Sequence, residues 1–314
     1  MNDVTAGRVM SFRQRLQAAQ ARHDSLLCVG LDPEPSRFPG AWRDDPARIF
    51  DFCAAIVDAT KDRVCAFKPQ IAYFAAQRAE HQLERLMAHI RAVAPEVPVI
   101  LDAKRGDIGP TAEQYGREAF DRYGADALTL SPFMGLDSIE PYLRWTGRGL
   151  ILLCRTSNPG GSDLQAQRLV SDAPGGELLY ERIARLAAGE WSTRHAAAEL
   201  GLVVGATFPH ELARVRALAP ALPLLVPGVG AQGGDAAATV QAAWQPGPGA
   251  GALVVNSSRA VLYAAVAAGE DFRDAARRVA AATRAQLHQA QQQAQQEAQR
   301  AAQAAIGAVP AAAG

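Results

Sequence analysis

Three charged side chains follow a strand-like apolar run, close enough in sequence to act together on a substrate. The run Val99–Leu101 leads directly into Asp102 and Lys104, and Asp107 follows beyond the turn-forming Gly106. Side chains alternate between the two faces of a strand, so we expect Asp102 and Lys104 to point the same way. Removing each ion from water costs several kcal/mol even after relaxation, and packing does not require that cost. We therefore interpret this Asp-x-Lys-x-x-Asp segment as chemical machinery rather than as a structural ion-pair network.

A carboxylate beside a protonated lysine suits the loss of carbon dioxide. Pairing with carboxylates favours the protonated form of Lys104, and Lys68, which ends another strand-like run, extends the alternating charges. A fixed carboxylate repels a substrate carboxylate placed against it, while the ammonium group stabilises and then protonates the resulting carbanion. The alternative, a Schiff base on Lys104 or Lys68, needs a lowered lysine pKa, which neighbouring aspartates oppose.

A second group of residues has the composition of a phosphate-binding site. Residues 227–234 form a glycine-rich segment, and Arg259 follows the next strand-like run. Glycine lets backbone N–H groups approach an anion closely, and arginine binds phosphate through a fork of donors. Glycine-rich segments also form ordinary turns. Barrel enzymes, however, bind phosphate at two successive loops of this kind, so the pairing favours a phosphate site.

Asp32 and Ser157 also end strand-like runs, and each has two interpretations. Asp32 stands before Pro33, where a carboxylate accepts a hydrogen bond from a sugar hydroxyl or simply forms a turn. Ser157 can hydrogen-bond the edge of a base, or it is an ordinary serine of a turn. The local pattern leaves both alternatives open for both residues.

Eight strand-like runs alternate with helical segments and can position these side chains. Continuous rather than alternating apolar runs indicate strands covered on both faces, as in parallel sheets. Most runs end in polar residues, and barrel enzymes build their active sites at that end of the strands. We therefore predict an α/β fold, a (β/α)8 TIM barrel with its active site at the C-terminal ends of the strands; a doubly wound open sheet is the alternative. The predicted strands are Leu26–Leu31, Val64–Lys68, Val97–Ala103, Ala127–Ser131, Leu150–Arg155, Leu202–Thr207, Leu222–Pro227 and Ala252–Asn256.

The segments between these strands are predicted to be mainly helical, with two exceptions. Ala72–Ala94 and Glu177–Leu200 have helical patterns, whereas Asn158–Gly176 is a long Gly/Pro/Asp-rich connection suited to an active-site lid. From about Gln286 the chain becomes Ala/Gln-rich, which predicts a frayed helix or a disordered tail without a catalytic role. We accordingly expect one barrel domain at residues 1–284 and a low-complexity tail at residues 285–314.

Composition narrows the class of protein. The chain has 314 residues, of which 49% are hydrophobic, and its 32 basic residues balance 32 acidic ones. We therefore expect no nucleic-acid partner and no membrane association, and we find no signal peptide or transmembrane run. The 4 cysteines stand singly in apolar stretches and the 6 histidines are scattered. This pattern predicts reduced, buried thiols in a cytoplasmic protein and no metal site.

Taken together, the motifs resemble the orotidine 5'-phosphate decarboxylase family, in its longer bacterial subfamily. The resemblance runs from about Phe12 to Arg284. The Asp-x-Lys-x-x-Asp element is shared with sugar-phosphate decarboxylases of the same superfamily, but its combination with Phe-Lys-Pro-Gln and Thr-Ser-Asn-Pro-Gly is narrower. The segments that carry the resemblance are Val29–Pro33, Phe67–Gln70, Leu101–Ile108, Arg155–Gly160, Val226–Gly234 and Asn256–Arg259.

The resemblance implies conversion of orotidine 5'-phosphate to uridine 5'-phosphate and carbon dioxide, without a metal or organic cofactor, in de novo pyrimidine biosynthesis. It implies that Lys104 protonates C6 of the pyrimidine and that Asp102 lies against the departing carboxylate. It also implies a homodimer with shared active sites, in which Asp107 reaches into the neighbouring subunit's site. The remaining implied contacts are Asp32 and Lys68 to ribose hydroxyls, Ile108 and Thr111 beside Asp107, Ser157 to the pyrimidine, and Gln232 and Arg259 to the 5'-phosphate.

Two other functions are weighed against this interpretation. A metal-dependent sugar-phosphate decarboxylase or epimerase would use the same barrel and the same Asp-x-Lys-x-x-Asp element. A non-catalytic nucleotide-binding protein would use the phosphate loops alone. A nucleotide-binding protein has no evident need for buried alternating charges. Dependence on magnesium would distinguish the sugar-phosphate enzyme from a cofactor-free decarboxylase.

Overall fold

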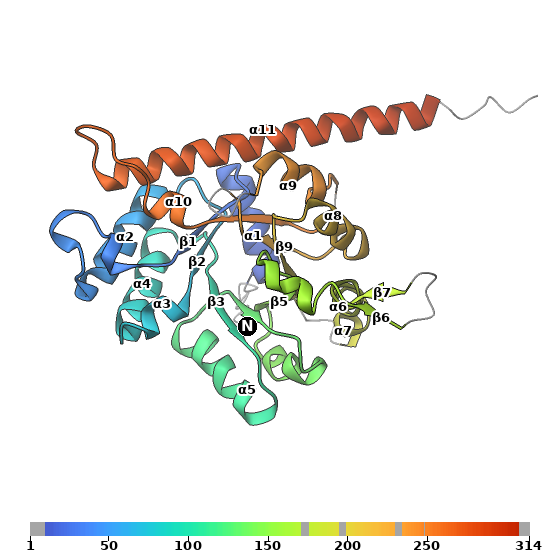
Figure 1. The fold of residues 1–314 in the computed structure, drawn as a ribbon, viewed down its shortest axis with the longest axis horizontal. Helices are drawn as coiled ribbons and strands as arrows, with labels where there is room; N and C mark the ends of the chain where they lie inside the picture. The colour runs from blue at the N-terminus through green and yellow to red at the C-terminus, as the bar shows by residue number, and fades with distance from the viewer. Residues whose placement is uncertain (1–9, 171–175, 195–198, 230–233, 248, 308–314) are drawn as a thin grey trace, which may run out of the picture.

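The computed structural model describes residues 10–170, 176–194, 199–229, 234–247 and 249–307. Eight parallel strands form one sheet in the order β2-β1-β10-β9-β8-β5-β4-β3, with helices around them (Figure 1). Parallel bridges from Phe67 to Val99 and from Gln70 to Asp102 link the two ends of that order, so the barrel is nearly closed. The predicted TIM barrel is confirmed. The strands are β1 (Leu27–Leu31), β2 (Ala66–Pro69), β3 (Ile100–Arg105), β4 (Ala127–Leu130), β5 (Gly149–Arg155), β8 (Glu199–Val204), β9 (Leu224–Val226) and β10 (Leu253–Ser257).

The barrel interior below the strand ends is apolar and is plugged from one side by helix α1 (Phe12–His23). Phe12 and Leu16 of α1 join an inner cluster of strand residues that includes Cys28, Ile151 and Val254. All of these side chains are buried. A Cβ on Gly149 would stand 2.3 Å from the Phe12 ring, so glycine is required where the ring enters the barrel. This packed floor closes the barrel interior at the end where α1 enters.

A second, larger core lies between the strands and the outer helices. Two predicted helices prove to be interrupted. Ala72–Ala94 is split between Ala75 and Glu80, and Arg78 in this break has a φ of 51°. The predicted helix Glu177–Leu200 is wrong at both ends, because Glu177 lies in a short strand and Leu200 belongs to β8. The outer helices are α2 (Ile49–Thr60), α3 (Ile71–Ala75), α4 (Glu80–Val93), α5 (Gly109–Gly116), α6 (Leu179–Ala188), α7 (Glu190–Arg194), α8 (Pro209–Leu218), α9 (Ala236–Ala243) and α10 (Arg259–Leu262).

The predicted lid connection has structure of its own. A turn of 3₁₀ helix covers Pro159–Asp163. Two short antiparallel strands, β6 (Arg168–Leu169) and β7 (Glu177–Leu178), form a hairpin beside the barrel (Figure 1). The segment is therefore an ordered appendage over its described residues rather than a plain link.

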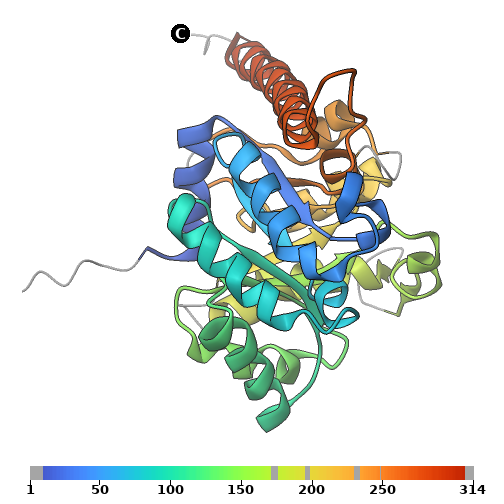
Figure 2. The same ribbon diagram turned by 90° about the vertical axis from the view of Figure 1, so that its left-hand side faces the viewer.

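The last helix, α11 (Phe272–Gly307), is 36 residues long and crosses the expected domain boundary at residue 284 without a break. Its first half packs on the barrel, with Ala276, Ala280 and Leu287 fully buried. Its far end projects past the barrel in both views (Figures 1 and 2), and residues 299–304 are all exposed. The Ala/Gln-rich sequence is thus helical through most of its length. No helix among the described residues is long and apolar enough to cross a membrane.

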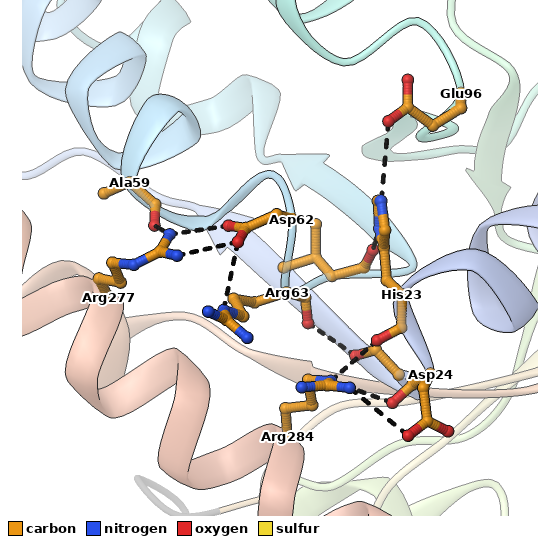
Figure 3. A network of polar contacts seen from close by, with 10 residues as sticks. His23, Asp24, Ala59, Asp62, Arg63, Glu96, Arg277 and Arg284 are labelled. Atoms are coloured by element: carbon orange, nitrogen blue, oxygen red, sulfur yellow. Dashed lines mark hydrogen bonds and ion pairs between the residues drawn. The ribbon is translucent and has the colours of Figure 1, made fainter.

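Polar contacts fasten α11 to the barrel (Figure 3). Arg277 donates to both carboxylate oxygens of Asp62, at 2.7 and 2.9 Å, and to the carbonyl of Ala59 at 2.9 Å. Arg284 donates to the carbonyl of His23 at 2.8 Å and lies 3.4 Å from the carboxylate of Asp24. The helix is therefore joined to the C-terminal ends of α1, before β1, and of α2, after β1.

Candidate active site

A cavity of about 570 Å³ opens at the C-terminal end of the barrel. Every one of the eight barrel strands, or the residue directly after it, contributes a side chain to its wall. The strand-end motifs predict the active site at this end of the barrel, where barrel enzymes bind their substrates. In strand order along the chain the contributors are Asp32, Lys68, Asp102, Thr129, Leu153, Val203, Leu225 and Asn256.

Three charged side chains meet at the floor of this cavity. Lys68 Nζ lies 2.8 Å from Oδ2 of Asp102, and Lys104 Nζ lies 2.6 Å from Oδ1. The Lys68 and Asp102 side chains are only 5% and 10% exposed, whereas Lys104 is 46% exposed and reaches toward the open space. Asp102 is thus clamped between two ammonium groups, one of which remains accessible to a ligand.

The electrostatics keep this set ionised. Burial alone would raise the pKa of Asp102, but the ammonium groups of Lys68 and Lys104 outweigh it and hold that pKa below its ordinary value. Burial alone would lower the pKa of Lys68, but the carboxylates of Asp102 and Asp32 hold it above its ordinary value. At neutral pH the carboxylate is therefore charged and Lys68 is protonated.

Lys104 and Asp102 meet, as predicted, but not through regular strand alternation. The pairing of β3 with β4 shifts register between Leu101 and Arg105, and Lys104 has a φ of 47°. This left-handed conformation is unfavourable for a residue other than glycine and persists only where the surroundings impose it. The strand end is therefore specially shaped to present the ammonium group.

Thr129 of β4 is a site residue that the sequence analysis missed. Its hydroxyl lies 2.9 Å from Oδ1 of Asp102 and accepts hydrogen bonds from the backbone N–H groups of Ala103 and Lys104, both at 3.0 Å. The side chain is 1% exposed. A lone threonine inside the apolar run Ala127–Leu130 was the only available signal, because its partners lie on another strand.

Asp32, directly after β1, and Arg259, which follows β10, both line the cavity. Oδ1 of Asp32 is buried and accepts no hydrogen bond, so it is ready to accept one from a ligand hydroxyl. Arg259, the first residue of α10, lines the same cavity, as does Tyr73 from α3. Here too Asn256 has a buried Oδ1 without a partner.

Ser157 also lines the cavity, and its backbone is held on both sides. Thr207 donates to the Ser157 carbonyl at 3.1 Å. A Cβ on Gly205 would stand 2.6 Å from Cα of Ser157, so only glycine permits this approach. On the other side, Gln165 accepts from the backbone N–H of Thr156 at 2.8 Å. The lid segment that carries Gln165 therefore fixes the serine that precedes it.

Not every predicted site residue reaches the cavity. Asp107 uses its carboxylate to cap the N–H of Ile108 at 2.9 Å, Ile108 is 49% exposed, and Thr111 is exposed on α5. None of the three lines the cavity of the single chain. Gln232 lies outside the described residues. Among the described residues, no group of three or more His, Cys, Asp or Glu side chains is arranged to hold a metal ion. The 4 cysteines are all buried and unpaired, as expected.

A barrel whose strand ends hold a buried carboxylate between two ammonium groups belongs to the class of TIM-barrel enzymes. Comparison with known proteins identifies the group within that class. The sequence model of the orotidine 5'-phosphate decarboxylase / HUMPS family matches residues 25–273, and this chain belongs to that family. A relative named orotidine 5'-phosphate decarboxylase, from Methylibium petroleiphilum, is 71% identical over 284 residues, which cover 90% of this chain and 100% of the relative.

Solved structures agree with the sequence comparison. The OMP decarboxylase of Leishmania donovani is 39% identical, with a TM-score of 0.72 over 88% of this chain and 98% of that one. The UMP synthase of the same organism is 38% identical, with a TM-score of 0.74; the match covers 89% of this chain but 57% of that longer protein. These relatives do not favour the sugar-phosphate enzyme or the non-catalytic nucleotide-binding protein considered above.

Proposed function

We propose that this protein decarboxylates orotidine 5'-phosphate to uridine 5'-phosphate in pyrimidine biosynthesis. The observation that carries the proposal is the ionised Asp102, clamped by Lys68 and Lys104 at the floor of the cavity. Membership of a family whose relatives bear that name supports it.

The reaction needs one bond to break and one to form, both at C6 of the pyrimidine. With the substrate carboxylate against Asp102, like-charge repulsion raises the energy of the bound substrate. The C6–carboxylate bond breaks, carbon dioxide leaves, and the electron pair stays on C6, where the Lys104 ammonium stabilises it. Lys104 then transfers a proton from Nζ to C6 and regains one from solvent. Lys68 keeps Asp102 ionised throughout.

The rest of the cavity would hold the rest of the nucleotide. The free oxygen of Asp32 and the Lys68 ammonium suit ribose hydroxyls, Ser157 suits the pyrimidine edge, and Arg259 suits the 5'-phosphate through its fork of donors. The family resemblance adds Gln232, which lies outside the described residues, to the proposed phosphate contacts. Binding energy gained at the phosphate, remote from C6, can then be used to order the site for reaction.

We also propose that two copies of the chain share their active sites. Asp107, Ile108 and Thr111 stand at the cavity end of the barrel without entering the chain's own cavity. Of these three, Ile108 is 49% exposed. Phe133 and Met134, which follow β4, are 80% and 45% exposed. Large exposed apolar side chains beside a site fit burial against a second copy. In that arrangement Asp107 completes the partner's charge set.

Mixed dimers test the sharing. Lys104→Ala and Asp107→Ala variants, each inactive alone, should regain about a quarter of wild-type activity when dissociated and reassociated in equal amounts, because half of the dimers then contain one intact site. A monomer by sedimentation, or no recovery in dimers shown to exchange, would overturn the shared site.

The activity itself is tested by the loss of orotidine 5'-phosphate absorbance on addition of purified protein. Turnover should be complete and unchanged in the presence of a metal chelator, since no metal or organic cofactor is proposed. No turnover at micromolar enzyme would sink the proposal, and loss of activity in chelator would point to a metal-dependent reaction. We also propose a cytoplasmic location, which suits 4 buried, unpaired cysteines.

A further inference from the structure

The hydroxyl of Thr129 uses all of its hydrogen-bonding capacity on β3. A threonine hydroxyl has one hydrogen to donate and two lone pairs to accept with. The backbone N–H groups of Ala103 and Lys104 take both lone pairs, each at 3.0 Å. The single hydrogen therefore points to Oδ1 of Asp102, at 2.9 Å. The directions of all three hydrogen bonds follow from the donor and acceptor inventory.

These contacts act on the two reacting groups at once. The oxygen of Asp102 that receives the Thr129 hydrogen is the one that lies 2.6 Å from Lys104 Nζ. Two successive N–H groups converge on one oxygen only when the backbone bends out of the extended conformation, and Lys104 does so with a φ of 47°. The hydroxyl thus stabilises the bend that turns Lys104 toward the cavity.

We propose that Thr129 is a positioning residue for the proton transfer: it holds the Lys104 backbone in its left-handed conformation and the Asp102 carboxylate in line with the Lys104 ammonium. This inference rests on the proposed decarboxylation. Thr129 lies at the wall of the cavity below the charged set, and its role is to act through Asp102 and Lys104. Without the hydroxyl, two N–H groups lose their acceptor and Lys104 is released to relax toward ordinary strand geometry.

Substitution by valine isolates the hydroxyl. Thr129→Val keeps the branched shape that packs in β4 and removes only the oxygen, while Thr129→Ser keeps the oxygen and removes a methyl group. Thr60→Val is the matched control: Thr60 is also fully buried and donates at 2.7 Å to the carbonyl of Ile56, inside α2 and away from the cavity.

A small displacement of a reacting group lowers the rate of the chemical step by about 100-fold. We expect Thr129→Val to lower kcat by about that factor, with the Kd of uridine 5'-phosphate and the KM within about threefold of wild type, because the nucleotide contacts remain. Thr129→Ser should recover most of the lost kcat. Thr60→Val should keep wild-type kcat even if its Tm falls.

Crystal structures of wild type and Thr129→Val give a readout that does not depend on turnover. The Lys104 φ should leave the left-handed region and the Nζ–Oδ1 distance should lengthen in the variant. If wild type shows no turnover, the proposed function fails while the geometry still tests Thr129. Should Thr129→Val not fold, Thr129→Cys, which replaces the oxygen with a weak hydrogen-bonding sulfur, is measured in the same way. Wild-type kcat in the valine or cysteine variant, equal losses in valine and serine variants, or an unmoved Lys104 would overturn the inference.

Discussion

Two charged clusters in this molecule use the same chemistry in different surroundings. At the cavity floor, the paired Lys68 and Asp102 side chains are 5% and 10% exposed. Along the C-terminal helix, the paired Arg277 and Asp62 are 40% and 49% exposed (Figure 3). Both pairs meet at hydrogen-bonding distance, yet only the first was removed from water when the chain folded.

The difference in exposure between the two clusters indicates a different role for each. Exposed pairs contribute about 0–1 kcal/mol and cost little to form, so they suit the fastening of one element to another. Buried pairs repay their desolvation only when several hydrogen bonds hold them, and apolar residues of the same volume are often as stable. The buried charged set leaves the Lys104 ammonium group accessible, which indicates a role in acting on a ligand rather than in stabilising the fold.

The largest effect should come from the accessible member of the buried set. In the proposed mechanism, Lys104→Ala removes both the charge that stabilises the carbanion and the proton donor, so kcat/KM should fall by about 10⁴-fold or more. Stopped-flow or long-incubation absorbance assays at high enzyme concentration measure the residual rate. Lys61→Ala, which removes an exposed lysine paired with Asp58 at 3.5 Å, should leave the rate unchanged. An active Lys104→Ala variant would remove Lys104 from the mechanism.

Loss of the central carboxylate should affect stability as well as rate. Asp102→Asn leaves the Lys68 ammonium buried without its nearest counter-charge, which should lower the free energy of unfolding by about 3 kcal/mol at pH 7. Urea denaturation measures this change. Full stability in the variant would mean that Lys68 finds another partner or becomes neutral at little cost.

The same carboxylate should give the buried set a signature in acid. Because pairing lowers the folded-state pKa of Asp102, its stabilisation is complete above the unfolded pKa of about 4 and is lost as pH falls toward the lower folded value. Wild type should therefore lose stability faster than Asp102→Asn below about pH 4. Unfolding curves for the two proteins that stay parallel over this range would contradict the assignment.

A smaller effect is expected where the cavity depends on a glycine. Gly205→Ala would force its Cβ to within 2.6 Å of the Ser157 Cα, so Ser157 must move. Because Ser157 is the proposed contact to the pyrimidine, its displacement should lower kcat/KM by about 10- to 100-fold, seen mainly as a higher KM. Gly160→Ala, in a loop that lines the same cavity, meets nothing closer than 3.6 Å, so it separates crowding against Ser157 from the mere addition of a methyl group at the cavity wall. Equal kinetics in both variants would show that binding of the pyrimidine does not depend on Ser157.

The smallest effect should come from the exposed cluster. Arg277→Ala should lower the free energy of unfolding by about 0.5–1 kcal/mol, less at high salt, with unchanged kcat/KM. Arg273→Ala, whose arginine pairs with Asp271 near the start of the same helix without reaching the barrel, should change stability less. A loss of activity in Arg277→Ala would contradict the assignment of the exposed cluster to stability and of the buried set to activity.

Sequence patterns predicted the barrel and most of the charged site because these are properties of single segments. Each apolar run maps onto a strand, and Lys68, Asp102 and Lys104 lie at strand ends that a barrel must bring together. The break at Arg78 escaped prediction because Ala72–Ala94 keeps a helical pattern across it. Propensity alone therefore did not reveal where tertiary packing interrupts a helix.

What the sequence could not supply are contacts between strands. Thr129 looks like one polar residue in an apolar run until β4 is placed beside β3. The need for glycine at position 205 is visible only once Ser157 lies against it. Likewise, spacing alone groups Asp107 with Asp102 and Lys104, and only family resemblance predicts that it serves a partner's site; the single chain does not bring it into the cavity.

The fastening of α11 also bears on how the chain folds while it is being synthesised. Arg284 donates to the carbonyl of His23, the last residue of α1, just before β1, and the two residues are 261 positions apart. Chains emerge from the ribosome at about 5–20 residues per second. The end of α1 must therefore wait many seconds for this partner, and through that interval the flank of β1 and α2 that α11 contacts lacks its covering helix.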